Sequence, residues 1–298
     1  MILTVCLNPT FQKTMLFDSF KDGEVNRCKT HYLDASGKGM NTARIITQLG
    51  GTAALLTHLG GPRMDEMLTL SSKDSVEILY TDSQSEIRTC TTIICNSVCT
   101  ELVEEPEAVK GDCEQAIRAL FTQALPRAEA VVICGTRAPG YSKNLYSDFV
   151  KEAKEAGKFV LLDIKGEDLR SSLVHRPDLI KPNFSEFVQT FFQKEVLENE
   201  QNRDLINLVQ AKMKELKEVY GTMSVISRGK HETLVYDTCH ATVPIEPVEV
   251  VNSIGCGDTL SASLTLSLLQ GLSLQQAAIV ATNHATIQAK TIHPGSLV

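Results

Sequence analysis

The sequence predicts a single α/β domain with a mostly parallel central sheet and a small accessory sheet. The chain has 298 residues, of which 43% are hydrophobic, so it can bury one large core. Short apolar runs alternate with segments of helical period, which is typical of βαβ units and a parallel sheet. No repeat, low-complexity tract or proline-rich linker divides the chain, so we expect one domain over residues 1–298.

The central sheet is predicted from apolar runs that precede or follow helical segments. The clearest strand candidates are 130–134, 158–164, 179–181 and 223–227. The helical segment that follows Ser142 stops at Gly157, and the one that starts near Asn202 stops at Gly221, as capped helices do. The segment after Gly257 and the segment 274–291 indicate a helical C-terminal third.

Two segments in the N-terminal third do not follow this alternation of strands and helices. Residues 10–34 and 87–103 are rich in Thr, Ile, Val, Phe and Cys, and they alternate like short strands with no helix between them. They predict an accessory sheet inserted near the N-terminus. An acidic cluster is expected on a solvated edge or loop of this region: Glu101, Glu104, Glu105 and Glu107.

Charge and cysteine usage exclude several classes of protein. A formal net charge of −7 gives no overall positive field to attract nucleic acid or an anionic membrane surface. The start of the chain has no basic leader or cleavage pattern, and no apolar run has membrane-spanning length, so we expect a soluble, cytoplasmic protein. The nine cysteines contain no Cys-x-x-Cys pair and are expected to be reduced, mostly buried thiols.

The segment 251–260, VNSIGCGDTL, predicts an anion site at a helix N-terminus. Gly255 and Gly257 allow the backbone to approach a ligand closely, and the helix that follows supplies unpaired N–H groups and the positive end of its dipole. Asp258 lies in the first turn of that helix. Two interpretations are open for it from these residues alone, a helix-capping carboxylate and a catalytic one.

The segment 35–51, ASGKGMNTARIITQLGG, predicts a second polar helix start. Ser36 or Gly37 opens the helix, and Lys38 and Asn41 lie at its entrance. The alternative is an ordinary capped helix with a solvated lysine, although two glycines beside Lys38 weaken a helix and need a reason. Neither glycine-rich segment matches a Walker loop or a dinucleotide-binding fingerprint.

The order of short motifs along the chain resembles the phosphofructokinase B, ribokinase-like sugar kinases, and most of all their 1-phosphofructokinase and tagatose-6-phosphate kinase branch. The resemblance covers nearly the whole chain. It rests on LNPT, NR (26–27), SGKGMN (36–41), LGG (49–51 and 59–61), IR (87–88), TEL (100–102), CGTRAPG (134–140), IKPNFSE (180–186), SRG (227–229), NSIGCGD (252–258) and PG (294–295). It implies a three-layer α/β/α sandwich whose accessory sheet, from about 10–34 and 87–103, forms a lid.

The resemblance implies that a sugar hydroxyl attacks the γ-phosphate of Mg-ATP. Asp258 would then be the catalytic base, with the amides of Gly255, Cys256 and Gly257 as the anion hole. Asn183 and Glu186 match the magnesium motif of the family, although from the residues alone they equally predict a helix N-cap and its capping-box partner. Further nucleotide contacts would come from Ser227, Gly229 and Asn283.

On the acceptor side, the resemblance implies that Lys38, Arg88 and Arg27 meet the existing phosphate of a phosphosugar. Gly37 and Asn41 match contacts to the sugar. The lid of these kinases often serves as a dimer interface, so a homodimer is expected, and Arg27 acts either within its own subunit or across to a partner.

The chain departs from the family pattern on the acceptor side. Gln12 stands where the family has an Asp that binds acceptor hydroxyls, and an amide donates as well as accepts hydrogen bonds. The chain also has Ser36 in SGKG and Arg137 in GTRAP. Three functions therefore stay open: a phosphosugar kinase, a kinase of an unphosphorylated sugar or polyol, and a non-catalytic metabolite-binding protein.

Cys256 carries a separate expectation. A thiol at a helix N-terminus within an anion hole is expected to have a lowered pKa. The favoured alternative is a small residue that packs.

Overall fold

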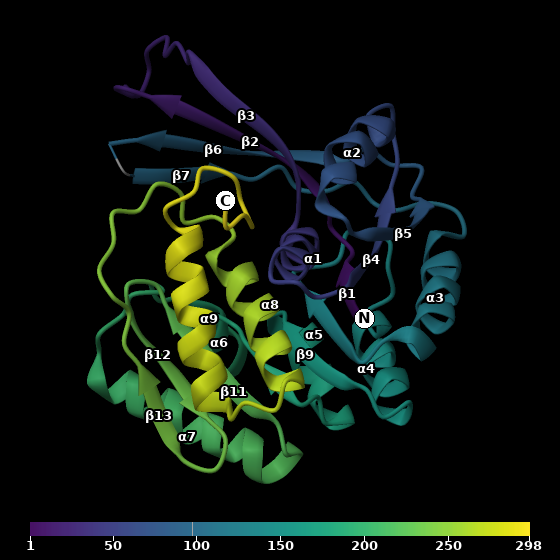
Figure 1. The fold of residues 1–298 in the computed structure, drawn as a ribbon, viewed down its shortest axis with the longest axis vertical. Coiled ribbons are helices and arrows are strands. Elements are labelled where there is room, and N and C mark those ends of the chain that lie inside the picture. Colours follow the sequence, from purple (N-terminus) through teal and green to yellow (C-terminus); the bar gives the residue numbers. More distant parts are fainter. Residues whose placement is uncertain (97) are drawn as a thin grey trace.

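The computed structural model describes residues 1–96 and 98–298. A nine-stranded central sheet lies between two layers of helices, and a separate four-stranded sheet projects from one end (Figure 1). The strands are β1 (Ile2–Cys6), β2 (Thr10–Phe17), β3 (Thr30–Ser36), β4 (Ala53–Leu59), β5 (Glu77–Asp82), β6 (Arg88–Cys95), β7 (Val98–Leu102), β8 (Ala130–Cys134), β9 (Phe159–Asp163), β10 (Leu179–Ile180), β11 (Met223–Arg228), β12 (His231–Tyr236) and β13 (His240–Val243). The helices are α1 (Lys38–Gln48), α2 (Met64–Ser71), α3 (Cys113–Ala124), α4 (Leu145–Glu155), α5 (Gly166–Ser172), α6 (Phe184–Phe192), α7 (Arg203–Tyr220), α8 (Cys256–Leu269) and α9 (Leu274–Gln288).

The central sheet has the strand order β13-β12-β11-β10-β9-β8-β1-β4-β5. All neighbours from β11 to β5 pair in parallel, and only β12 and β13 pair antiparallel. The mostly parallel sheet predicted from the sequence is therefore confirmed. Parallel strands buried on both faces consist of continuous apolar runs, which is why AVVIC and FVLLD were recognisable.

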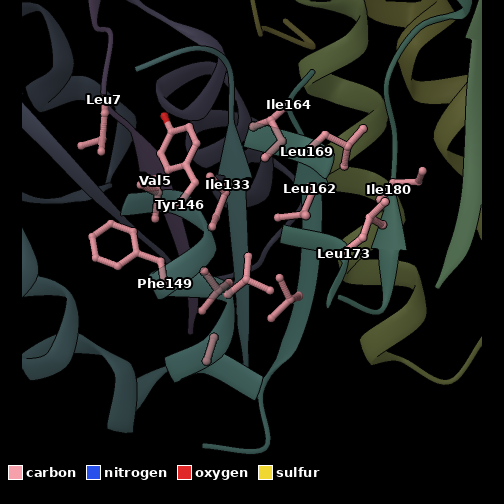
Figure 2. Close-up of a cluster of buried hydrophobic side chains, with 14 of the residues drawn as sticks. Val5, Leu7, Ile133, Tyr146, Phe149, Leu162, Ile164, Leu169, Leu173 and Ile180 are labelled. Carbon is pink, nitrogen blue, oxygen red and sulfur yellow. The ribbon is translucent and has the colours of Figure 1, made fainter. Parts of the chain in front are cut away.

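Each face of the sheet has its own hydrophobic core, because side chains alternate along every strand. In β1, Leu3 and Val5 join the core under α3, α4, α5, α6 and α7. Ile2 and Cys6 join the core under α1, α2, α8 and α9. Figure 2 shows part of the first core, where Tyr146 and other buried side chains pack beside the strands. These two cores fix the ends of the strands relative to the helix starts.

The second sheet has the order β3-β2-β6-β7 and comes from the two segments predicted to form an accessory sheet. Its inner strands β2 and β6 pair in parallel, and the outer strands pair antiparallel to them. We call this sheet the lid. The chain passes from β1 to β2 through Leu7–Pro9, so the lid begins next to the end of a central strand (Figure 1).

The ends of the helices agree only in part with the sequence pattern. Helix α7 ends at Gly221 in a left-handed conformation, as predicted. The start expected after Ser142 is wrong: α4 begins at Leu145 with Asn144 as N-cap. Ser142 instead gives its hydroxyl and backbone N–H to the Glu114 carboxylate, at 2.6 and 2.7 Å, so it ties a loop to α3.

The acidic residues lie where their composition suggested, whereas the expectation of mostly buried thiols is wrong, because only four of the nine cysteines are buried: Cys6, Cys90, Cys113 and Cys134. The acidic cluster Glu101, Glu104, Glu105 and Glu107 lies on β7 and the loop after it, mostly exposed, as predicted. All nine cysteines are free thiols. Within residues 1–96 and 98–298, no helix is both long and apolar enough to cross a bilayer.

Candidate active site

Several of the residues predicted to act on substrates lie near the carboxyl ends of the parallel strands, and three others lie in the lid. The N-termini of α1, α6 and α8 point to this edge of the sheet, where open α/β sheets bind ligands. Three helix starts at one edge supply unpaired N–H groups and positive dipole ends, which favour an anionic ligand.

The start of α8 has the backbone predicted for an anion hole. Gly255 is the N-cap residue with φ of +94°, and a Cβ atom there would collide with the nitrogen of Gly295. Only glycine satisfies both conditions. At Gly257 a Cβ atom would meet only the ammonium of Lys181 within 4 Å, at 3.6 Å. The space where a Gly257 side chain would lie is therefore bordered by a cation.

Asp258 lies in the first turn of α8, where the helix dipole favours a carboxylate as predicted, but its side chain makes no capping hydrogen bond in the described residues. No side chain caps α8, and the buried Asp258 carboxylate accepts a hydrogen bond of 2.8 Å from the Asn41 amide. Burial, reinforced by the negative charge of Asp163, raises the pKa of Asp258 to about 6. A carboxyl group with that pKa is ionised at neutral pH and can still accept a proton, as a general base must.

Asn41 is held in one orientation by three neighbours. Its Oδ1 accepts from the Ser36 hydroxyl at 3.0 Å and from the Arg44 guanidinium at 3.1 Å, which leaves Nδ2 as the donor to Asp258. Arg44 is itself buried and forms an ion pair of 2.9 Å with Asp74. Arg44 was not predicted from the sequence, where its place beside Ile45 and Ile46 on a helix with a buried face was the only signal for it.

The two glycines beside Lys38 have a packing reason. Gly37 has φ of +116°, and a Cβ atom at Gly39 would lie 2.7 Å from the Cβ of Cys6. The first turn of α1 therefore packs directly on the end of β1. This close approach explains the glycines, and it brings Lys38 to the edge of the sheet.

Lys38 lies between two carboxylates. Its ammonium lies 3.3 Å from Asp163 at the end of β9 and 3.4 Å from Glu186 on α6. Burial lowers the pKa of Lys38, but Asp163, Glu186 and Asp258 outweigh burial and hold that pKa above its usual value. Lys38 thus lies beside a residue expected to hold magnesium, and its contact with the phosphate of a sugar stays a prediction.

Asp163 and Lys181 belong to this cluster, although neither was predicted from the sequence. Lys181 lies 3.2 Å from the Asp163 carboxylate, and their side chains are 3% and 1% exposed. Burial raises the pKa of Asp163, yet the charges of Lys181 and Lys38 hold it below its ordinary value. Their positions could have predicted them, because Asp163 ends a buried strand and Lys181 follows one, at the edge of the sheet that binds ligands.

The residues predicted for the nucleotide side lie on neighbouring elements. Asn183 and Glu186 form a complete capping box at α6, so their structural interpretation is confirmed. Asn183 pairs with Ser227 through an isolated backbone bridge. Gly229 lies in the β11–β12 turn, where its N–H donates to Glu198 at 3.2 Å. Asn283 is exposed on α9.

Three of the residues predicted for the acceptor side, Gln12, Arg27 and Arg88, lie in the lid, and the other three lie at the start of α1. Gln12 is buried in β2, and its amide donates to the Thr92 hydroxyl at 2.8 Å. Arg88 donates to the Glu104 carbonyl at 2.9 Å, while its Nε is buried with no partner in the described part of the chain. Arg27 lies in the β2–β3 connection, in a hollow at the lid tip lined by Leu16, Phe17, Asp18, Lys29 and Thr30.

The lowered pKa expected for Cys256 is wrong. Burial, followed by the negative charges of Asp258 and Glu198, raises the pKa of this thiol to about 12. These effects outweigh the helix N-terminus, so the side chain is a neutral, packed thiol that donates to the Ala285 carbonyl at 3.5 Å. The backbone N–H of Cys256 forms a long hydrogen bond of 3.3 Å with the Ser253 carbonyl.

Comparison with known proteins shows which family this arrangement belongs to. The sequence profile described as "pfkB family carbohydrate kinase" matches residues 7–296. The chain belongs to the pfkB family of carbohydrate kinases. It is therefore a phosphotransferase with an alcohol group as acceptor, and the fold expected from the resemblance is confirmed.

Solved structures of this fold resemble the whole chain. Phosphofructokinase-2 from Escherichia coli, in complex with substrates and products, has 22% identity and a TM-score of 0.84, covering 97% of this chain and 92% of its own. A possible 1-phosphofructokinase from Thermotoga maritima has 19% identity and a TM-score of 0.85, covering 98% and 92%. A putative ribokinase from Agrobacterium tumefaciens has 15% identity and a TM-score of 0.76, covering 99% and 92%.

Proposed function

We propose that this carbohydrate kinase transfers the γ-phosphate of ATP to a hydroxyl group of a phosphosugar. The observation that carries the proposal is the buried Asp258 carboxylate, held by Asn41 beside the open backbone turn at Gly255–Gly257. A base and an anion site so close together suit phosphoryl transfer, which depends mainly on positioning and on neutralising charge.

The chain's own residues account for each requirement of the reaction. Asp258 accepts the proton of the attacking hydroxyl, and Asn41 holds its carboxylate in place. The amides of Gly255, Cys256 and Gly257 bind the oxygens of the phosphoryl group in transfer. Lys38 lies beside these groups as a fixed positive charge, so we assign it to the transferred phosphate rather than to the sugar's own phosphate.

The nucleotide side fits ATP with a magnesium ion. Asn183, Ser227 and Gly229 present polar groups on adjacent elements, and Glu186 contributes one hard carboxylate oxygen there. No cluster of three or more His, Cys, Asp or Glu suited to a metal occurs in the described residues, so a bound ion would take most of its oxygens from phosphates and water. Mg²⁺ binds in this way, and it would neutralise charge on the phosphates.

The acceptor side fits a sugar that already carries a phosphate. Arg88 offers a buried guanidinium nitrogen without a partner among the described residues, which is an unsatisfied donor that an anion would pair. Asn41 contacts Asp258 directly, so Asn41 and the neighbouring Gly37 are proposed to contact the sugar beside the base. Similar solved structures are phosphofructokinases, one of them in complex with fructose-6-phosphate.

A second candidate is a kinase of the same fold that acts on an unphosphorylated sugar or polyol. Gln12 favours it, because a neutral amide replaces the usual Asp and its Nε2 already donates to Thr92, so it would recognise acceptor hydroxyls differently. Arg27 also favours it, since it lies at the lid tip and would need a partner subunit to reach the site.

A substrate panel separates the two candidates. ATP turnover is measured with fructose 1-phosphate, fructose 6-phosphate, tagatose 6-phosphate and the free sugars. We expect turnover with one or more phosphosugars, and we expect Arg88→Ala to raise their KM by about 10- to 100-fold, the value of a charged hydrogen bond or two. The matched control is Arg127→Ala, because Arg127 forms an exposed pair with Glu77 at the opposite edge of the central sheet. Preferred turnover of a free sugar, unaffected by Arg88→Ala, would favour the second candidate.

We also propose a homodimer formed through the lid. By strand alternation, one face of the lid carries Met15, Phe17, Leu33, Ile93, Val98 and Leu102. Val98 and Leu102 are 62% and 53% exposed, which is a large apolar exposure for positions on one strand. A second copy of the same sheet would cover this face, and phosphofructokinase-2 from Escherichia coli has a tetrameric inhibited form.

A further inference from the structure

The Asp163 carboxylate joins three elements at the edge of the active site. It ends β9, and its two oxygens lie 3.3 Å from the ammonium of Lys38 and 3.2 Å from the ammonium of Lys181. It also accepts the Ser261 hydroxyl of α8 at 2.9 Å. Its side chain is 1% exposed, so these contacts replace the water that an exposed carboxylate would bind.

The two lysines reach opposite sides of the proposed path of transfer. Lys181 lies 3.6 Å from the position of a Cβ at Gly257, so its ammonium faces the anion hole. Lys38 lies 3.4 Å from Glu186, so its ammonium faces the nucleotide side. One carboxylate therefore holds two cations, one beside the start of α8 and one beside Glu186.

The burial of Lys181 makes Asp163 necessary. A lysine with a 3% exposed side chain keeps its charge only when a partner replaces the water that it loses. Asp163 is the carboxylate within ion-pair distance of Lys181 in the described residues. Without it, the buried ammonium would be left with an uncompensated positive charge.

We propose that Asp163 is a positioning residue of the transfer reaction: it holds Lys38 and Lys181 on the two sides of the transferred phosphate and places a fixed negative charge beside Asp258. The role of Asp163 in the transfer reaction rests on the proposed function, in which Asp258 is the base. The arrangement of charges around Asp258 does not depend on that function.

The charged and titratable groups that face Asp258 come from every element packed around it. They are Lys38 of α1, Cys134 of β8, Asp163 of β9, Lys181 after β10 and Cys256 of α8. Burial raises the pKa of Cys134 well above its usual value, and that of Cys256 also lies far above neutrality, so both thiols are uncharged. Asp163 is thus the negative charge opposed by two positive ones.

The test follows the Asp258 carboxyl carbon by ¹³C NMR titration of the ligand-free protein, with the signal assigned through Asp258→Asn. In Asp163→Asn we expect the Asp258 titration midpoint to fall by about 1 pH unit, because a like charge is removed. In Lys181→Met we expect it to rise, because an opposite charge is removed. The control Asp178→Asn breaks the Lys154 pair at the other end of the sheet and should leave the midpoint unchanged.

The two variants are expected to shift the Asp258 midpoint in opposite directions, so either variant tests the inference by itself if the other fails to fold. Equal midpoints in Lys181→Met and the native protein, or shifts of the same sign in both variants, would overturn it. This readout needs no acceptor, so it stands apart from the substrate panel. With the acceptor that the panel identifies, Asp163→Asn should lower kcat by roughly 10- to 100-fold, as loss of a supporting group does, and Asp163→Glu should recover part of it.

Discussion

The ionised Asp258 carboxylate is needed for catalysis but lowers the stability of the folded protein. Its carboxylate is buried and lies near Asp163, and its pKa is raised to about 6. A base of this kind is active only when it is ionised. The ionised form is also the form that burial disfavours.

The first prediction at this scale concerns the pH dependence of turnover. Because kcat/KM reports the ionisation of the free enzyme, we expect it to fall as the pH drops below about 6, and not below about 4 as for an ordinary aspartate. The measurement is a pH profile of kcat/KM between pH 4.5 and 8. A kcat/KM that stays constant from pH 8 down to about pH 5 would show that the pKa of Asp258 is not raised.

The second prediction concerns stability. A raised pKa in the folded protein means that stability from this group is full below the unfolded value of 3.8 and is lost as the pH rises through about 6. Asp258→Asn removes the ionising group, so it should be about 1–3 kcal/mol more stable than the native protein at pH 7.5. Unfolding by urea at pH 7.5 and pH 4.5 measures this. A stabilisation of equal size at both pH values would show that burial of the charge is not its cause.

At the scale of secondary structure, helix starts carry both fold and function. The capping box of α6 uses Asn183 and Glu186 to satisfy backbone groups, and Glu186 also lies within reach of the Lys38 ammonium at the proposed nucleotide side. The start of α8 uses no side chain and depends on backbone geometry at Gly255.

A third prediction separates the two roles of Glu186. Glutamine can replace glutamate in a capping box, so Glu186→Gln should change the melting temperature little. It removes the carboxylate proposed for the magnesium ion, so the Mg²⁺ concentration needed for half-maximal turnover should rise by about tenfold. The control Asn183→Ala should cost about 1 kcal/mol through the cap itself. A Glu186→Gln variant with native Mg²⁺ dependence would argue against the metal role.

A fourth prediction compares the two ends of α8. Gly255→Ala must accept a left-handed φ and a clash with Gly295, so we expect a loss of more than about 2 kcal/mol in stability together with loss of activity. Gly271→Ala after the helix also has a positive φ, of +87°, but nothing lies within 4 Å of its added Cβ. It should lose about 1 kcal/mol and keep its activity. Equal losses in both variants would mean that the contact with Gly295 is unimportant.

At the scale of the whole molecule, the lid face proposed to join two copies gives a fifth prediction. Leu102→Asp places a charge among apolar side chains that a second copy would cover, so it should halve the molar mass measured by light scattering at micromolar concentration. Leu208→Asp, on the exposed side of α7, is the control and should not change the mass. A native protein that is already monomeric at this concentration would contradict the dimer.

Much of the architecture follows from local pattern, since buried parallel strands and capped helices leave strong signals in the sequence. The α/β class, the accessory sheet, the end of α7 at Gly221 and the α6 capping box were all predictable in this way. Ser142 was misassigned because a hydroxyl can serve a distant carboxylate as well as a helix, and sequence does not show the Glu114 partner.

The site was predictable only in part, because its contacts join residues far apart in the chain. Asp258 and Asn41 are 217 positions apart, and nothing in either segment shows that they meet. The packing of Gly37 and Gly39 on β1 brings Lys38 to Asp163, a contact that neither segment shows. Asp163 and Lys181 look like ordinary strand-end residues until the sheet brings them together.

The most direct test of the proposed kinase mechanism is the turnover of Asp258→Asn with ATP and the best acceptor of the panel. Loss of a general base should lower kcat by about 10²- to 10⁴-fold, while ATP binding, measured by calorimetry, should stay within a few-fold of native because the amides at Gly255–Gly257 remain. A variant whose kcat stays within a few-fold of the native protein would contradict the role of Asp258 as the base.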